Sequence, residues 1–298
     1  MSWHGKILRV DLTTGSCESE NLNMKWAEEY LGQRGLATKY LMEEMDPSAD
    51  ALGSENKLII ATGPLTGTNA STGGRWSAVT KGALTGAIAC SNSGGQFGGE
   101  LKMAGWDFII IEGQAQNPVY LHIENEKAEL LDASGLWGRS VWEIEPEIKN
   151  SHGDPLMRVA SIGPAGENMV RYACIVNDLH RAAGRSGVGA VMGSKRLKAI
   201  AVRGTKGVNV SNHKKFLAAV KDTNQTLAEN EGRMGLTRFG TIPMMDVTGS
   251  FGALPTRNNR EVQFEGLEKI NANAMQSPNE RGHTNFITNG ACFGCTIG

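Results

Sequence analysis

Short runs of aliphatic residues, each bounded by glycine or another turn-forming residue, recur along the first two thirds of the chain. Such runs are typical of β-strands that are buried on at least one face. The strands predicted in this way cover residues 5–12, 58–62, 108–112, 119–123, 159–162 and 199–202. One helix is predicted over 24–45, where Leu31, Ala37, Tyr40 and Leu41 share a face and Asp46-Pro47 ends the element. This mixture indicates a fold with both α and β structure.

One order of motifs occurs twice, in residues 57–113 and again in 158–204: a strand, a Gly-Pro pair, an arginine before an aromatic residue, a glycine-rich loop, a helix and a strand. The matching pairs are Gly63-Pro64 with Gly163-Pro164, Arg75-Trp76 with Arg171-Tyr172, Gly94-Gly95 with Gly184-Arg185, and Glu112-Gly113 with Arg203-Gly204. Echoes of this kind also arise by chance in a glycine-rich chain. Their shared order favours an internal duplication folded about a pseudo-two-fold axis.

The pattern of residues along the chain changes at about Val208. A polar linker with a helix-capping serine, Ser211, precedes a segment with helical spacing over 213–227. Glycine, proline, asparagine and threonine are then scattered through 232–290, which is typical of loops. A domain boundary is therefore predicted near 208–212.

Composition narrows the class of protein. Among 298 residues, 30 Lys and Arg stand against 31 Asp and Glu, so a net charge of -1 gives no general attraction to nucleic acid or to an anionic membrane. The start of the chain lacks a signal-type apolar segment, and the aliphatic runs are too short to span a bilayer, which favours a cytoplasmic protein. Five cysteines do not suit a disulfide scaffold, whereas 38 glycines indicate many tight turns or backbone-lined surfaces.

Two glycine-rich segments, 91–95 and 181–187, each precede a predicted helix. Backbone N–H groups at a helix start attract anions, and glycine lets a phosphate or a flat ring approach the chain. Such an anion could also accept paired hydrogen bonds from the guanidinium groups of Arg75, Arg181 and Arg185. The alternative is that the glycines only permit close packing and that the arginines are solvated. The glycines at 187–193 are spaced one residue too far apart for the dinucleotide fingerprint, and Gly193-Ser194-Lys195 interposes a serine that rules out a P-loop.

The sequence Cys292-Phe-Gly-Cys295 is the sharpest local motif. Two thiolates at this spacing can hold a zinc or iron–sulfur centre, or can form a redox disulfide. A metal centre normally takes four ligands, and Cys17, Cys90 and Cys174 are predicted to be buried core thiols instead. The missing ligands would therefore come from elsewhere.

Taken together, these segments resemble the aldehyde ferredoxin oxidoreductase family of tungsten and molybdenum pterin enzymes. The resemblance covers essentially the whole chain. It rests on GKILRVDLTTG at 5–15, GPLTG at 63–67, GGRWSAVTKGALTG at 73–86, SNSGGQFGGELKMAGWDFIIIEG at 91–113, RAAGRSGVGAVMGSKRLKAIAVRG at 181–204 and the terminal CFGC. Several long blocks in one order are far more specific than any single motif.

The resemblance implies an α+β fold: a duplicated base domain in residues 1–208, followed by the beginning of a mostly helical domain in 209–298. A tungsto- or molybdo-bis-pterin cofactor would lie on the base. Its binding positions carry over to Arg75, Asn92, Gly94, Arg181, Ala182, Gly184 and Arg185. Main-chain carbonyls of Asn92 and Ala182 would hold part of a Mg²⁺ site between the two pterin phosphates. Cys292 and Cys295 match the first two ligands of a [4Fe–4S] cluster.

The implied reaction is oxidation of a small aldehyde, with water, to a carboxylic acid. Two electrons would pass through the cluster to ferredoxin or a similar carrier, and a homodimer is one assembly that the resemblance allows. Family members are considerably longer, so the other cluster cysteines and the catalytic acid/base residues are expected beyond Gly298. The chain is accordingly expected to be an N-terminal fragment that is inactive alone. Two other hypotheses stay open: a zinc-stabilised binding module, and a nucleotide-binding enzyme that uses the glycine loops.

Overall fold

A computed structural model describes residues 2–298, which form two compact units. The first comprises the residues up to 217 together with 292–294, and the second comprises 218–291 and 295–298. The domain limits predicted from the sequence, 1–208 and 209–298, stay a prediction.

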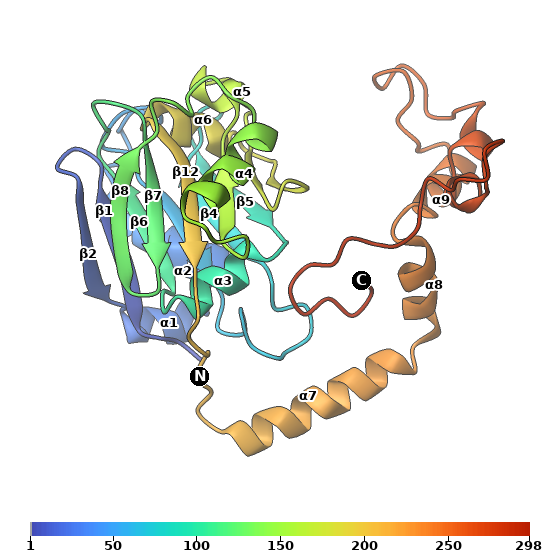
Figure 1. Ribbon diagram of the computed structural model, residues 1–298, viewed down its shortest axis with the longest axis horizontal. Helices are drawn as coiled ribbons and strands as arrows, with labels where there is room; N and C mark the ends of the chain where they lie inside the picture. The colour runs from blue at the N-terminus through green and yellow to red at the C-terminus, as the bar shows by residue number, and fades with distance from the viewer. Residues whose placement is uncertain (1) are drawn as a thin grey trace. The chain divides into compact units, whose positions relative to one another are not determined.

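The first unit contains two six-stranded mixed sheets (Figure 1). The first sheet has the strand order β2-β1-β6-β3-β4-β5, with β1 (Lys6–Asp11), β2 (Ser16–Asn21), β3 (Leu58–Thr62), β4 (Trp76–Lys81), β5 (Ile88–Ser93) and β6 (Phe108–Glu112). The second has the order β8-β7-β12-β9-β10-β11, with β7 (Val119–Glu124), β8 (Lys127–Asp132), β9 (Arg158–Ser161), β10 (Ile175–Asn177), β11 (Arg181–Ala183) and β12 (Leu197–Arg203). The helices of the first unit up to β12 are α1 (Met24–Tyr30), α2 (Gln33–Glu44), α3 (Phe97–Met103), α4 (Val141–Ser151), α5 (Pro164–Glu167) and α6 (Val188–Ser194).

The two sheets repeat one topology. Only β1 with β6 and β7 with β12 are parallel, and the remaining neighbours in both sheets are antiparallel. Individual hydrogen bonds also match: the amide of Thr62 donates to the carbonyl of Asp107, and the amide of Ile162 donates to that of Lys198. The matching order includes the hairpins β1–β2 and β7–β8, which precede the segments recognised in the sequence. The duplicated α+β fold is thereby confirmed.

One predicted correspondence within the duplication is wrong. On β4, Trp76 pairs with Ser93, and on β10 the residue at the same place in the ladder, Ile175, pairs with Ala183. Trp76 therefore corresponds to Ile175 and not to Tyr172, which lies in a turn before β10 and is 79% exposed. An arginine beside an aromatic residue is too short a motif to determine a strand register.

The single helix predicted over 24–45 is also wrong, because the chain breaks between α1 and α2. Leu31 has a positive φ of 61° and is 69% exposed, so it is not on the buried face. The following Gly32 lies against the indole of Trp3, where a Cβ would come within 2.7 Å of the ring. This contact requires glycine at a position where a continuous helix would carry on.

Alternating side chains divide each buried strand between two cores. On β6, Ile109 and Ile111 join a cluster that both sheets share with α3 and α6, whereas Phe108 and Ile110 pack with α1 and α2. On β12, alternate residues pack in the same way toward the shared cluster or toward α4. Fully burying one such side chain contributes about 1.5–3 kcal/mol. The shared cluster therefore joins the two repeats.

Helix α7 (His213–Ala228) crosses the boundary at 217, and the second unit continues with α8 (Glu231–Phe239), α9 (Met244–Ser250), a 3₁₀ turn η1 (Leu267–Lys269) and α10 (Ala272–Gln276). Asn230 and Asn271 begin α8 and α10 by accepting hydrogen bonds from backbone amides of the first turn. The unit is thus helical with long connecting loops. None of the helices described in residues 2–298 is both long and apolar enough to cross a membrane.

Candidate functional site

Strand β5 presents alternate side chains to opposite faces. Ser91 and Ser93 are buried, whereas Asn92 between them is exposed. The side-chain amide of Asn92 donates to the carbonyl of Trp76 (3.1 Å), and its Oδ1 accepts a hydrogen bond from Nη1 of Arg75 (2.8 Å). Asn92 and Arg75 are therefore held side by side on the surface of the first repeat.

The backbone of Arg75 is fixed by two further side chains. Nε2 of Gln33 donates to the Arg75 carbonyl (2.8 Å), and Oγ1 of Thr66 donates to the same oxygen (3.2 Å). A cavity of about 380 Å³ is lined by these three residues together with exposed Leu31 and Leu65. This volume lies in the range of small-molecule sites, and Arg75 supplies it with a positive charge.

The first cysteine of the CxxC motif lies against the glycine-rich loop that follows β5. A Cβ added to Gly94 would come within 2.7 Å of Sγ of Cys292 and 3.9 Å of Nε of Arg75. The thiol and the guanidinium thus lie against the same glycine. A larger residue at this position would displace Cys292.

The residues after Cys292 also lie against glycine backbone. The amide of Phe293 donates to the carbonyl of Gly95 (2.9 Å). A Cβ at Gly74 would lie 2.9 Å from the Phe293 nitrogen, and one at Gly99 would lie 3.1 Å from its ring. We call Gly74, Gly94, Gly95 and Gly99 the glycine cradle. The cradle places residues 292–294 on the first repeat.

In the second repeat, Ala182 and Gly184 occupy the positions that correspond to Asn92 and Gly94 of the first. Ala182 pairs with Val176 on β11 as Asn92 pairs with Ser77 on β5, and both Ala182 and Asn92 are exposed. The exposed residues Gly184 and Arg185 follow β11 as Gly94 and Gly95 follow β5.

Two contacts bring the glycine-rich segments of the two repeats together. The amide of Arg185 donates to Oγ of Ser91 (2.9 Å), and a Cβ at Gly95 would lie 3.1 Å from Cγ of Arg181. The sequence had singled out both glycine-rich segments. It had not predicted a role for Gln33 on α2, and the alternating burial of Ser91 and Ser93 becomes visible only once β5 is known to be a strand.

The five cysteines are free and half-buried. Burial raises the pKa of Cys17 to about 11, with a smaller contribution from the charge of Glu129, and burial also raises the pKa of Cys90. Both pack at the edge of a core cluster. Cys292 belongs to the first unit and Cys295 to the second. Within residues 2–298, no three His, Cys, Asp or Glu side chains form a metal-binding group.

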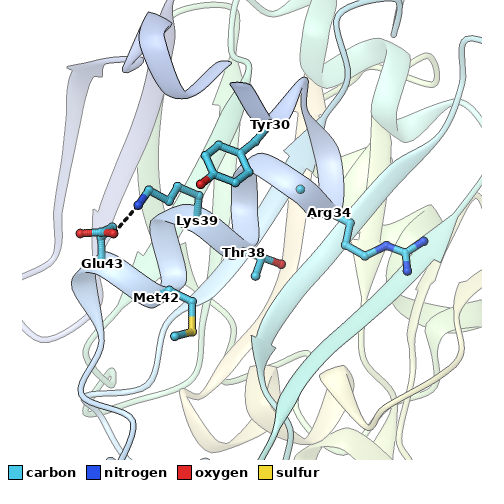
Figure 2. A pocket seen from close by; sticks show the side chains of 7 residues that line it. Tyr30, Arg34, Thr38, Lys39, Met42 and Glu43 are labelled. Atoms are coloured by element: carbon cyan, nitrogen blue, oxygen red, sulfur yellow. Dashed lines mark hydrogen bonds and ion pairs between the residues drawn. The ribbon is translucent and has the colours of Figure 1, made fainter. Parts of the chain in front are cut away.

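A larger cavity, of about 600 Å³, lies on α1 and α2 (Figure 2). It is lined by Tyr30, Arg34, Gly35, Thr38, Lys39, Met42 and Glu43, none of which is a predicted cofactor-binding residue. Lys39 forms an ion pair with Glu43, which raises the pKa of the lysine, and its Nζ lies over the rings of Trp26 (5.1 Å) and Tyr30 (5.9 Å). The lysine of this cavity is thus engaged within the protein.

The first unit is a duplicated α+β domain in which glycine-rich loops from both repeats, exposed arginines and one CxxC cysteine form one set of contacts. Residues 7–204 match the family model described as aldehyde ferredoxin oxidoreductase, N-terminal domain, and residues 218–298 match that described as aldehyde ferredoxin oxidoreductase, domains 2 & 3. The chain belongs to the aldehyde ferredoxin oxidoreductase family, as its motifs predict.

Individual relatives support this membership. The chain is 49% identical over 295 residues to the tungsten-containing aldehyde ferredoxin oxidoreductase of Pyrococcus abyssi, covering 99% of this chain and 48% of the relative. It is 39% identical over 221 residues to the aliphatic sulfonate oxidoreductase, WOR-like subunit, of Pyrococcus furiosus, covering 68% of this chain and 35% of that protein. The chain thus spans about half the length or less of these curated relatives.

A solved structure shows the same fold. The active-site complex BamBC of benzoyl coenzyme A reductase matches with a TM-score of 0.74 and 40% identity, over 77% of this chain and 35% of that one. The names of these relatives mention an aldehyde, an aliphatic sulfonate and benzoyl coenzyme A. Family membership therefore does not by itself define the substrate.

Proposed function

We propose that the protein oxidises an aldehyde to a carboxylic acid at a tungsten bis-pterin centre. Water supplies the new oxygen atom, and two protons and two electrons leave, the electrons passing through a [4Fe–4S] cluster to ferredoxin or a similar carrier. Relatives at 49% and 48% identity are named as tungsten-containing aldehyde ferredoxin oxidoreductases. The observation that carries the proposal is the contact of Cys292 with Gly94 beside Arg75, because it joins the proposed cluster ligand to the proposed cofactor loop.

The residues present fit a cofactor with two equivalent pterin halves. Asn92 and Ala182 occupy the same ladder position in the two repeats, and both are exposed. Their main-chain carbonyls would supply one oxygen ligand from each repeat to a Mg²⁺ ion, which prefers hard oxygen donors. When bound, the tungsten centre would supply the two-electron redox chemistry.

Within this proposal, the arginines bind and orient the cofactor. The guanidinium of Arg75 is held by Asn92 at 2.8 Å and remains exposed to a ligand. Arg185 is exposed in the second repeat, and Arg181 lies beside Gly95. Guanidinium groups bind phosphate through paired charge-assisted hydrogen bonds. Arginines from both repeats would therefore hold the two ends of one cofactor.

Cys292 and Cys295 would be two of the four thiolate ligands of the cluster. The contact of Cys292 with Gly94 would bring the cluster close to the cofactor loop, which favours electron transfer between them. A cytoplasmic setting, where thiols stay reduced, suits such ligands.

Replacing Arg75 or Arg181 by alanine in the full-length protein tests the cofactor assignment. Each substitution removes charge-assisted hydrogen bonds of about 1.5–3 kcal/mol, so tungsten and pterin content should fall about tenfold or more after gel filtration. Arg139→Ala is the matched control, since Arg139 pairs with Glu147 and is not a candidate ligand. Unchanged tungsten and pterin content in both variants would overturn the assignment.

Metal and cofactor analysis of the same protein separates the other hypotheses. Zinc without tungsten or iron supports a zinc-stabilised binding module, and a released nucleotide supports a nucleotide-binding enzyme. Tungsten, iron and a fluorescent pterin, together with aldehyde-dependent reduction of ferredoxin, support the proposed function.

A further inference from the structure

A buried asparagine of the second repeat holds the glycine loop of the first. Asn177, at the end of β10, is completely buried. Its Oδ1 accepts a hydrogen bond from Oγ of Ser93 (2.7 Å), and its Nδ2 donates to the carbonyl of Gly94 (2.9 Å). These bonds hold the end of β5 and the Gly94–Gly95 peptide that follows it.

The next residue, Asp178, binds the start of α3. Its Oδ2 accepts hydrogen bonds from the backbone amides of Gln96 (2.7 Å) and Phe97 (3.3 Å), and from Nδ2 of Asn177 (2.8 Å). A carboxylate is well suited to the free amides at a helix start. The side chain of Asp178 is 13% exposed, and Nη1 of Arg158 lies 3.8 Å from its other oxygen. One repeat thus caps a helix of the other.

The backbone at this junction is shaped for these contacts. Asp178 and Leu179 both have positive φ values, 48° and 56°, a conformation that costs about 1–3 kcal/mol in residues other than glycine. Gly95 also has a positive φ, 85°, and a Cβ there would overlap the Asp178 carboxylate. The strained backbone at Asp178 and Leu179 and the absence of a side chain at Gly95 therefore both allow the Asp178 carboxylate to approach the first glycine loop.

We propose that Asn177 and Asp178 are positioning residues that set the Gly94–Gly95 peptide and, through it, the position of Cys292. Gly94 contacts Sγ of Cys292, and Gly95 accepts the hydrogen bond from the Phe293 amide. The second repeat thereby controls the CxxC segment without touching it directly. The consequence for an iron–sulfur cluster rests on the proposed function.

The test measures the reactivity of Cys292 in the iron-free chain, so it does not depend on the cofactor. The rate of alkylation by iodoacetamide is followed at each cysteine by peptide mass spectrometry. Asp178→Ala should raise the rate at Cys292 about tenfold, because the segment opens more often once its support is lost. Asp178→Asn, which keeps an acceptor for the amides of α3, should restore most of the protection.

Gly95→Ala gives a second route to the same state, since its methyl group displaces the Asp178 carboxylate without removing it. It should raise the Cys292 rate to a similar extent. Asp154→Ala is the matched control, because Asp154 also pairs with an arginine, Arg203, but contacts neither loop. Cys17, on the distant strand β2, serves as the internal reference.

Unchanged alkylation of Cys292 in folded Asp178→Ala and Gly95→Ala would overturn the proposal, as would an equal rise at Cys17, which would indicate general loosening. The cluster link is examined separately by the electron paramagnetic resonance spectrum of reduced full-length Asp178→Ala. A faster Cys292 reaction with an unchanged spectrum would uphold the positioning role and contradict Cys292 as a cluster ligand. A changed spectrum would support both.

Discussion

The two repeats share a strand order but differ where the CxxC segment lies. In the first repeat, Gly74, Gly95 and Gly99 leave room for residues 292–294. When the strands are matched by register and the helices by their first residues, the corresponding residues of the second repeat are Ala173, Arg185 and Ala190. A duplication therefore supplies two similar frames, and side chains at a few positions decide which of them can accept another segment.

The repeats also differ in the buried charge at one corresponding position. Asp107 and Lys198 accept matching backbone hydrogen bonds, yet one is an acid and the other a base. Asp107 pairs with Lys102, and Lys198 pairs with Glu167, all of them buried or nearly so. Burial lowers the pKa of both lysines despite these partners. Each repeat thus has its own buried ion pair, and the corresponding position carries the acid in the first repeat and the base in the second.

Asp107→Ala, which breaks the ion pair of the first repeat, should cause the largest loss in the free energy of unfolding. It leaves the Lys102 ammonium buried without its partner and removes the acceptor of the Gly5 amide (2.7 Å). Removing one member of a buried pair costs about 3–5 kcal/mol, measurable by urea unfolding followed by tryptophan fluorescence. The double variant Lys102→Met/Asp107→Leu should recover part of the loss. A single variant that loses less than about 1 kcal/mol would show that the pair is not critical.

Gly74→Ala should weaken the contact of residues 292–294 with the glycine cradle, which only the first repeat has. Its methyl group would lie 2.8 Å from the Gly95 carbonyl and 2.9 Å from the Phe293 nitrogen, and such overpacking costs about 1–3 kcal/mol. Release of residues 292–294 relieves the overlap with Phe293, so hydrogen exchange at the Phe293 amide should accelerate. The matched change in the second repeat, Ala173→Gly, should leave that amide unaffected; equal exchange in both variants would contradict the cradle.

The pH dependence of stability should reveal another asymmetry, at Lys195, which corresponds to Ala104 of the first repeat. Lys195 is buried and donates to the Gly113 carbonyl (2.9 Å). Burial, assisted by the charge of Lys57, lowers its pKa to about 8 from 10.5. Between these two values the unfolded chain binds more protons, so the free energy of unfolding should rise with pH.

Lys195→Met should lack this contribution, so the difference in unfolding free energy between wild type and variant should change across pH 8 to 10. The exposed Lys206→Met serves as the control for the loss of one lysine at the surface. A curve for Lys195→Met that runs parallel to wild type would show that Lys195 stays protonated in the folded protein.

The smallest loss of stability is expected at an exposed cluster of ion pairs that joins the two repeats. Glu126 pairs with Lys6 (2.7 Å) and Lys206 (2.8 Å), and these two lysines lower its pKa to about 2. Exposed pairs contribute about 0–1 kcal/mol, so Glu126→Gln should change urea stability little. A loss as large as that of Asp107→Ala would overturn the contrast between buried and exposed pairs.

Much of the fold could be predicted from the chain alone. Aliphatic runs identified strands such as 58–62 and 108–112, because a strand buried on both faces needs apolar residues throughout. The polar strand β5 was missed as a strand, since Ser91-Asn92-Ser93 carries no apolar signal. Its serines are buried only because the second repeat supplies their hydrogen-bond partners.

The sequence by itself determined the family, the duplication and the two glycine-rich segments, because these are encoded in long runs of local pattern. The tertiary structure decided the rest. Strand register, the break at Leu31, the opposite buried ion pairs and the grip of Asn177 and Asp178 on the first glycine loop all depend on residues far apart in the chain. Their physical reason is burial: a polar group removed from water must find a partner, and only the folded chain determines which one.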